Sequence, residues 1–346
     1  MQNYFAFQWH ITDKCDQRCK HCYIFSDNIE KSLVETNYDD MKYIFYNCLN
    51  MCNKLNRKPY FYITGGDPIL HPDFWKLLEL FKENNVKFGI LGNPFHLNQK
   101  ICDKLKEYGC DRYQLSIDGL EETHDYFRKK GSYKTTLEKI DYIKKAGIKS
   151  VIMTTVSSIN IKEIPSIIDT IVNKADIFAF ARYCPTGNDK SNHIKPEEYK
   201  NLLENCFNKF NEYKDSNTSF TLKDHLWTLF LYEKGIFKIP NNLDDDLIYD
   251  GCNCGNSHLT ILPNGDIYAC RRMESKIGNI LKKETNIENI FLSEEADKYR
   301  NFDKFSCSDC ELFQFCRGCP AVSYGYTNNM YSKDPQCWKK LSIKEQ

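Results

Sequence analysis

Cys15-Asp16-Gln17-Arg18-Cys19-Lys20-His21-Cys22 places three thiols at C-x3-C-x2-C spacing near the start of the chain. Three thiolates can bind three irons of a [4Fe-4S] cluster and leave the fourth iron without a protein ligand. The ferredoxin spacing C-x2-C-x2-C differs and normally supplies a fourth Cys, whereas Tyr23 to Leu33 contain none. The stretch therefore predicts a cluster with one open corner. A zinc site and three unrelated buried thiols are the alternatives, since free Cys is among the most buried residue types.

This motif resembles that of the radical S-adenosylmethionine (SAM) enzymes. The resemblance implies that the open iron binds the amino and carboxylate groups of SAM, and that reductive cleavage of SAM yields a 5′-deoxyadenosyl radical. The family usually has an aromatic residue before the last Cys, near the adenine. Here that position is His21, a flat ring. We expect His21 and Tyr23, on either side of Cys22, to belong to the SAM site.

The composition is that of a large globular chain without an excess of either charge. It has 346 residues, of which 41% are apolar, and 47 basic residues balance 47 acidic ones. This balance gives no electrostatic case for binding nucleic acid or an anionic membrane. Residues 1–10 are too short and polar for a signal peptide. A run of about 18 apolar residues, which a membrane span needs, is absent from the sequence.

The chain contains 17 Cys, which is a high number. A secreted disulfide scaffold would explain them, but such chains are usually short. Without an export signal, we expect reduced thiols, many of them metal ligands, in a cytoplasmic protein.

Residues 1–190 predict a partial (β/α)6 TIM-like barrel of the α/β class. Apolar strands alternate with amphipathic helices six times, which favours a parallel sheet with helices outside. The predicted strands are 5–11, 59–64, 86–91, 113–117, 150–155 and 176–183, and the helices between them are 37–55, 73–84, 99–108, 133–146 and 164–174. Ligands gather at the C-terminal ends of such strands.

Gly65-Gly66-Asp67-Pro68 follows the second predicted strand. It resembles the Gly-Gly-Glu-Pro segment of the radical SAM family, where the backbone approaches the SAM amino group and glycine permits the close approach. The resemblance assigns Gly65, Gly66 and Asp67 to the SAM site, with Asp67 in place of the commoner Glu. Taken alone, the segment is only a turn signal.

Ser116-Ile117-Asp118-Gly119, with Arg128 downstream, resembles the family's fourth-strand pattern. The resemblance implies that Ser116, Asp118 and Arg128 lie on the carboxylate and ribose side of SAM, and Arg can pair bidentately with a carboxylate. The alternative is a strand-end turn followed by a solvated charged helix. Arg182, at the end of the sixth strand, is a further candidate SAM contact.

Residues 191–250 predict a helical linker, with helices at 197–212 and 224–234, and residues 251–346 a small cysteine-rich domain. Asn264-Gly265 between two apolar runs predicts a β-hairpin. The pattern C-x10-G-x4-C, then C-x2-C-x5-C-x2-C and a late Cys, resembles the SPASM domain, with its β-hairpin and short helices.

The SPASM resemblance implies two auxiliary [4Fe-4S] clusters, and so three clusters in all. Cys252, Cys254, Cys270 and Cys319 would bind the first; in the alternative, Cys252 or Cys254 is spare and one iron stays open. Cys307, Cys310, Cys316 and Cys337 would bind the second. Zinc remains the alternative, although zinc ribbons separate their Cys pairs by about 15–20 residues and the gap here is five. Six Cys are left as isolated thiols: Cys48, Cys52, Cys102, Cys110, Cys184 and Cys206.

The sequence around the first motif, from Phe7 to Phe25, resembles that of maturases of cysteine-rich, ribosomally made peptides. This resemblance implies that the protein forms thioether links. Arg271-Arg272 stands where the formylglycine-forming branch has an Asp after the hairpin Cys, which counts against that branch. The alternatives are carbon–carbon cross-linking, epimerisation, formylglycine formation, and a non-catalytic iron–sulfur electron carrier. No catalytic acid or base is predicted.

The expected partners are a precursor peptide and an electron donor such as flavodoxin or ferredoxin. With fourteen residues ahead of Cys15, there is no room for a leader-recognition domain there. Recognition of the leader is therefore expected to use the barrel, the linker helices or a separate protein.

Overall fold

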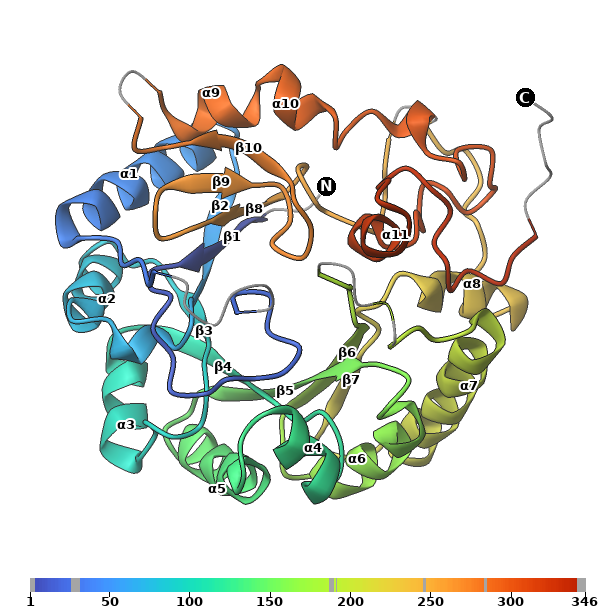
Figure 1. The fold of residues 1–346 in the computed structure, drawn as a ribbon, viewed down its shortest axis with the longest axis horizontal. Helices are drawn as coiled ribbons and strands as arrows, with labels where there is room; N and C mark the ends of the chain where they lie inside the picture. Colours follow the sequence, from blue (N-terminus) through green and yellow to red (C-terminus); the bar gives the residue numbers. More distant parts are fainter. Residues whose placement is uncertain are drawn as a thin grey trace.

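A ten-stranded sheet forms the centre of the computed structural model, which describes residues 4–25, 32–186, 190, 192–244, 247–282 and 285–340 (Figure 1). The strand order is β10-β9-β8-β1-β2-β3-β4-β5-β6-β7. The strands are β1 Tyr4–His10, β2 Lys58–Thr64, β3 Phe88–Leu91, β4 Cys110–Ser116, β5 Lys149–Val156, β6 Ile177–Arg182, β7 Ser219–Thr221, β8 His258–Ile261, β9 Asp266–Tyr268 and β10 Lys276–Asn279.

Helices surround the sheet on the outside (Figure 1). The α-helices are α1 Tyr38–Lys54, α2 Phe74–Glu83, α3 Gln99–Glu107, α4 Glu121–Phe127, α5 Ser132–Lys145, α6 Ile164–Ile171, α7 Pro196–Glu212, α8 Leu226–Glu233, α9 Ile287–Phe291, α10 Glu294–Asp297 and α11 Pro320–Thr327. Short 3₁₀ turns occur at Pro68–Leu70, Ile161–Glu163 and Phe302–Lys304. The strands β1 to β7 pair in parallel, so the predicted partial barrel is confirmed.

Helix α1 illustrates why the predicted alternation holds. Asn37 caps it by accepting a hydrogen bond from the Asp40 amide, which satisfies one of the free N–H groups of the first turn. Its buried face includes Phe45, which stacks on Phe61 of β2 with ring centroids 5.7 Å apart. The helix therefore covers the outside of the sheet and buries the apolar positions that its sequence spacing predicts.

The predicted linker 191–250 contains a strand as well as helices. β7 pairs in parallel with β6, and the Ser219 amide donates to the Asp176 carbonyl. Three residues are too few to show a strand periodicity in the sequence. The sheet thus continues across the predicted boundary at residue 190.

The cysteine-rich region also joins the barrel sheet, at the other edge. β8 pairs in parallel with β1, with Ala6 opposite His258 and Trp9 opposite Ile261. β8 and β9 form the predicted antiparallel hairpin through Asn264-Gly265. Gly265 has φ +82°, a conformation that glycine adopts without strain.

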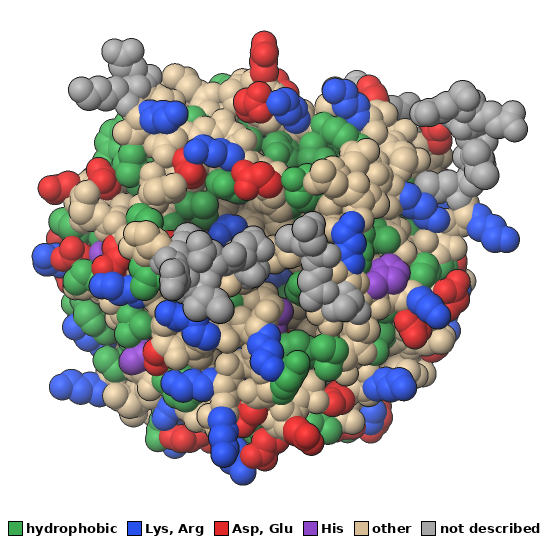
Figure 2. Space-filling view, in the orientation of Figure 1, with side chains coloured by type: hydrophobic (Ala, Val, Ile, Leu, Met, Phe, Trp, Pro, Cys, Tyr) green, Lys and Arg blue, Asp and Glu red, His purple; other side chains and the backbone are tan. Residues whose placement is uncertain are grey.

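The segment after β1 crosses the mouth of the barrel, where the C-terminal strand ends meet (Figure 1). Figure 2 shows a hollow at the centre of this face, with Lys and Arg side chains at its floor. Within the described part of the chain, no helix combines the length and the apolar character that crossing a membrane requires.

Candidate functional site

The loop with the first three Cys is held by the turn after β2. The Gly66 amide donates to the Thr12 carbonyl and the Asp67 amide to the Lys14 carbonyl, both at 2.7 Å. A Cβ atom on Gly65 or Gly66 would overlap the carbonyl oxygens of Thr12 or Lys14. Both glycines are therefore required for the close approach of the two loops, before any contribution to a SAM site.

Hydrogen-bond donors point at the sulfurs of this loop. The Gln17 amide lies 3.4 Å from Cys15 Sγ. Arg128 Nη1 lies 3.8 Å from Cys19 Sγ, and Asn93 Nδ2 lies 3.9 Å from Cys15 Sγ. Hydrogen-bond donors and a positive charge around thiolates suit an anionic iron–sulfur cluster. The reduction potential of such a cluster depends on these contacts.

Asp118 and Arg128 form a buried ion pair beneath the loop. Arg128 Nε donates to Asp118 Oδ2 at 2.5 Å, and the Thr155 amide donates to Asp118 Oδ1 at 2.8 Å. Although burial opposes ionisation, Arg128 and His21 keep the pKa of Asp118 below its ordinary value. His21 Nε2 lies 3.4 Å from the same carboxylate. Burial lowers the pKa of His21 to about 4, so its ring is neutral near pH 7.

The other residues expected in the SAM site lie on two sides of the loop. Ser116 ends β4, half-buried at the C-terminal edge. The Arg271 guanidinium lies 4.8 Å from the centre of the Tyr23 ring and 3.5 Å from its carbonyl oxygen. Tyr23 therefore joins the first cysteine loop to the hairpin of the cysteine-rich region.

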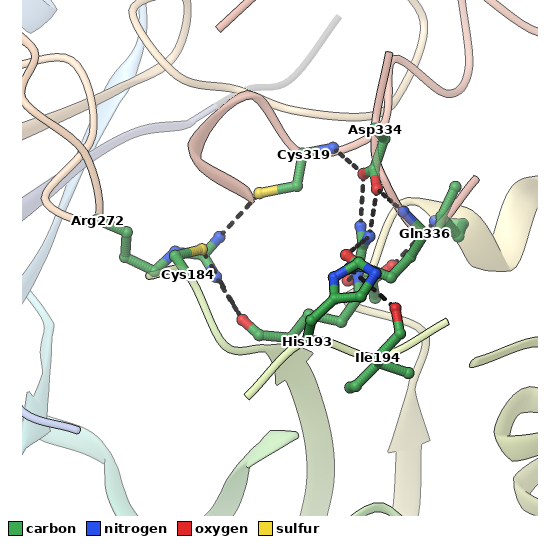
Figure 3. A network of polar contacts seen from close by, with 10 residues as sticks. Cys184, His193, Ile194, Arg272, Cys319, Asp334 and Gln336 are labelled. Carbon is green, nitrogen blue, oxygen red and sulfur yellow. Dashed lines mark hydrogen bonds and ion pairs between the residues drawn. The ribbon is translucent and has the colours of Figure 1, made fainter. Parts of the chain in front are cut away.

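Arg182, a candidate SAM contact, forms ion pairs with two buried carboxylates. Its Nε donates to Asp224 at 2.9 Å, and its two Nη atoms donate to the two oxygens of Asp334 at 2.6 and 2.8 Å. The side chain is fully buried, so its nitrogens are committed to these carboxylates. Asp334 also accepts from the Cys319 amide, and Gln336 donates to the Ile194 carbonyl (Figure 3). Arg182 thus fixes the backbone of Cys319, a predicted cluster ligand, through Asp334.

The four Cys assigned to the first auxiliary cluster converge, and a fifth thiol joins them. Cys254 contacts both Cys252 and Cys270. The Cys184 thiol lies beside Cys319, and Arg272 Nη2 lies 3.6 Å from the Cys319 sulfur (Figure 3). Cys184, which the sequence left isolated, therefore belongs to this group.

Positive groups surround these sulfurs. The His225 ring lies beside Cys252. This contact raises the pKa of His225 above its ordinary value, although burial acts in the opposite direction. Together with Arg272, it offsets the negative charge of a thiolate group, as an iron–sulfur cluster requires.

The four Cys assigned to the second auxiliary cluster line one small cavity. Cys307, Cys310, Cys316 and Cys337 share it with three leucines, Gly318 and four charged residues: Leu226, Leu229, Leu312, Arg317, Lys333, Asp334 and Lys339. An apolar wall beside four thiols suits a buried inorganic cluster.

The spacing of the sulfurs does not fit zinc. A tetrahedral zinc ion with Zn–S bonds of about 2.3 Å holds its sulfurs about 3.8 Å apart. Among the described residues, which include all seventeen Cys, no three Cys sulfurs lie within 4.8 Å of one another.

Several residues of the site were missed in the sequence. Asn93, Arg271 and Arg272 are adjacent to predicted ligands in space, and the two Arg residues directly follow Cys270. In the sequence, the position of Arg271 and Arg272 directly after the predicted cluster ligand Cys270 indicates that they lie near the cluster. Cys184 gave no signal, because its nearest predicted ligand in sequence is 68 residues away at Cys252.

Comparison with known proteins identifies two domains. Residues 9–171 match the family model described as the radical SAM superfamily. Residues 252–320 match the SPASM model, described as an iron–sulfur cluster-binding domain.

Curated relatives cover most of the chain at low identity. An AdoMet-dependent heme synthase of Nitratidesulfovibrio vulgaris is 26% identical over 95% of this chain and 90% of its own length. A mycofactocin maturase of Mycolicibacterium smegmatis is 23% identical over 95% of this chain and 81% of its own. Among solved structures, Streptococcus suis SuiB bound to its precursor peptide SuiA has a TM-score of 0.75 at 20% identity, covering 98% of this chain and 77% of SuiB. The structural likeness establishes the fold.

Proposed function

Because this chain is a radical SAM enzyme with a C-terminal SPASM domain, we propose that it forms thioether links in a ribosomally made, cysteine-rich precursor peptide. Its cofactors are SAM and [4Fe-4S] clusters. Cys15, Cys19 and Cys22 would hold the cluster whose open corner takes SAM, and SAM would there supply a 5′-deoxyadenosyl radical for removing a hydrogen atom from the substrate.

The observation that carries the proposal is one three-thiol loop together with two further groups of thiols in the same chain, one of five with Cys184 included and one of four. Linking a peptide Cys sulfur to a carbon removes the C–H hydrogen as an atom, the thiol hydrogen as a proton, and one further electron. We assign the auxiliary groups as acceptor of that electron. We choose the group of Cys252, Cys254, Cys270 and Cys319 for this role, because Arg182 and Arg272 tie Cys319 to the end of β6.

Residues of the barrel would hold and orient SAM. We assign His21, Tyr23, Ser116 and the backbone of residues 65–67 to its binding. Arg128 and Asp118 would act from beneath the loop, where the ion pair fixes the Cys19 surroundings.

The substrate assignment is supported by the likeness to SuiB, which was solved with a precursor peptide, and by the match to mycofactocin maturase. Arg271, packed on Tyr23, supports it further, because the formylglycine branch has an Asp at that position. We also propose reduction by a flavodoxin or ferredoxin, a separate leader-recognition protein, and a cytoplasmic location in which the thiolates stay reduced.

A heme synthase activity is the second candidate. It is favoured by a relative named AdoMet-dependent heme synthase, which matches this chain over 95% of its length. An iron-tetrapyrrole precursor is therefore the competing substrate in the assay.

The first test is anaerobic reconstitution with iron, sulfide, SAM and dithionite. We expect about twelve irons per chain, four for each cluster, and formation of 5′-deoxyadenosine. The Cys19→Ala variant is the control and should lose the deoxyadenosine while keeping the auxiliary iron. Wild-type protein that yields no deoxyadenosine would remove the peptide proposal together with the heme alternative.

The second test supplies a cysteine-rich precursor peptide encoded near this chain, or an iron-tetrapyrrole precursor. Each thioether link should make the peptide about two mass units lighter and protect one Cys from alkylation. An unchanged peptide mass contradicts the thioether proposal. Conversion of the tetrapyrrole to heme would instead support the heme synthase activity.

A further inference from the structure

Three potential metal ligands converge beside the first cysteine loop, outside the three groups of Cys. Asp16 lies in the loop after β1, Asp67 in the turn after β2, and His96 in the segment after β3. One ligand atom of each lies within 4.8 Å of the other two. His96 Nε2 and Asp16 Oδ2 are 3.1 Å apart. Three neighbouring parallel strands thus bring two carboxylates and an imidazole to one point.

Asp67 is the unusual member of this group. The residue is completely buried, and neither carboxylate oxygen has a hydrogen-bond partner. The amides of Ile69 and Asn93 lie nearby without reaching hydrogen-bond geometry. Burying an unpartnered polar group costs about 1–3 kcal/mol or more, and such groups commonly mark a missing water or ion.

The surroundings supply no side-chain cation for Asp67. Among the described residues, no Lys or Arg forms an ion pair with its carboxylate. Lys129 approaches only the Asp16 carbonyl, at 3.4 Å. Asn93 Nδ2 donates to Asp16 Oδ1 at 2.8 Å, which leaves Asp16 Oδ2 facing His96. Two carboxylates thus face each other, and among the described residues no Lys or Arg forms an ion pair with either.

We propose that Asp16, Asp67 and His96 bind a divalent transition-metal cation of the Mn²⁺ class. Two carboxylate oxygens and one imidazole nitrogen suit Mn²⁺, Fe²⁺ or Zn²⁺. Ca²⁺ is a poorer match, because it prefers six to eight oxygen ligands. The side chains of Asp16 and His96 are 34% and 35% exposed, so they can close on the ion and water can complete its coordination.

The cation would lie next to the first cysteine loop. Asn93 Nδ2 contacts both Asp16 and the Cys15 sulfur. A positive charge on the far side of Asn93 would favour reduction of a cluster bound by Cys15, because added positive charge stabilises the more negative state. This inference does not depend on the identity of the substrate.

The test uses the reconstituted, oxidised holoenzyme, cleared of loose metal on a chelating resin and titrated with Mn²⁺ under anaerobic conditions. Binding removes the six-line electron paramagnetic resonance signal of free Mn²⁺, and the oxidised [4Fe-4S] clusters are silent in that experiment. We expect one Mn²⁺ per chain. Asp16→Asn and His96→Gln, both at partly exposed positions, should each weaken binding at least tenfold.

Asp103→Asn is the matched control, since Asp103 is an exposed carboxylate on α3 away from the group. It should bind Mn²⁺ as the wild type does. Absence of Mn²⁺ binding, or equal affinity in wild type, Asp16→Asn and His96→Gln, would overturn the site.

Discussion

Arg182 shows how a single side chain joins the barrel to the cysteine-rich region. It ends β6 and binds Asp224 before α8 and Asp334 near the C-terminal end. Asp334 in turn accepts from the backbone amide of Cys319. The position of a proposed cluster ligand thus depends on a buried ion-pair network whose members are far apart in the sequence.

Replacing Arg182 with Met should destabilise the chain strongly. Removing one partner of a buried ion pair costs about 3–5 kcal/mol, because the remaining charges are left unpaired. Urea unfolding should show a loss of this size, together with reduced iron content. Arg182→Lys keeps the charge but not the forked geometry, so its loss should be smaller. A change below about 1 kcal/mol in Arg182→Met would contradict the network's role.

His124 should make stability depend on pH. Its Nδ1 accepts from the Asp118 amide, so the folded chain needs the neutral ring. Burial, with Arg128 next, lowers its pKa to about 4, below the unfolded value of 6.5. Between those values the unfolded state binds the proton more readily, so the stabilisation is present above pH 6.5 and is lost as the pH falls towards 4.

The expected loss between pH 7 and pH 5 is about 1–2 kcal/mol for His124. Urea unfolding of wild type and His124→Gln at both pH values isolates this contribution, because Gln retains an acceptor that does not titrate. The variant should lose less stability than the wild type on acidification. Parallel losses in both proteins would contradict the assignment.

At the scale of elements, the turn after β2 positions the first cysteine loop. Gly66 donates to Thr12, and a Cβ atom there would overlap the Lys14 carbonyl. The backbone contact between these two loops depends on the absence of a side chain. The packing of the two loops therefore explains why glycine occupies positions 65 and 66.

Gly66→Ala should push the cysteine loop away and lower its capacity for iron. We expect about four fewer irons per chain and loss of deoxyadenosine formation. Gly147→Ala, at the left-handed end of α5 with φ +73°, is the control. It should cost about 1 kcal/mol of stability from backbone strain with unchanged iron content. Full iron content in Gly66→Ala would show that the loop tolerates the overlap.

At the scale of the molecule, one sheet runs through all three predicted segments. β8 pairs with β1 at one edge, and β7 pairs with β6 at the other. Thr36 Oγ1 donates to the Pro263 carbonyl at 2.9 Å, which adds a second tie to the hairpin. The barrel region and the cysteine-rich region therefore share a core.

A chain truncated after residue 250 should fail to fold to a monomer. Removing β8 exposes the hydrogen-bonding edge of β1 and uncovers apolar side chains around Trp9. Size-exclusion chromatography and dye binding to exposed apolar surface should report aggregation. Full-length Cys307→Ser, which retains every strand, should stay monomeric while losing auxiliary iron. A monomeric truncated chain that unfolds cooperatively would contradict the shared core.

The sequence by itself determined the alternation of strands and helices, the hairpin at Asn264-Gly265 and the class of cofactor. These features follow from local periodicity, turn chemistry and the spacing of cysteines, which are all set by neighbouring residues. The α/β barrel was predictable for the same reason, since each strand is long enough to show its pattern.

Only the tertiary structure decided the roles of residues that act across distance. Arg182 was expected at SAM, but it binds Asp334, 152 residues away. Cys184 gave no sequence signal, yet it contacts Cys319. β7 was too short to predict, and only pairing with β6 makes it a strand. Charge pairing and sheet pairing depend on three-dimensional proximity, which no local pattern specifies.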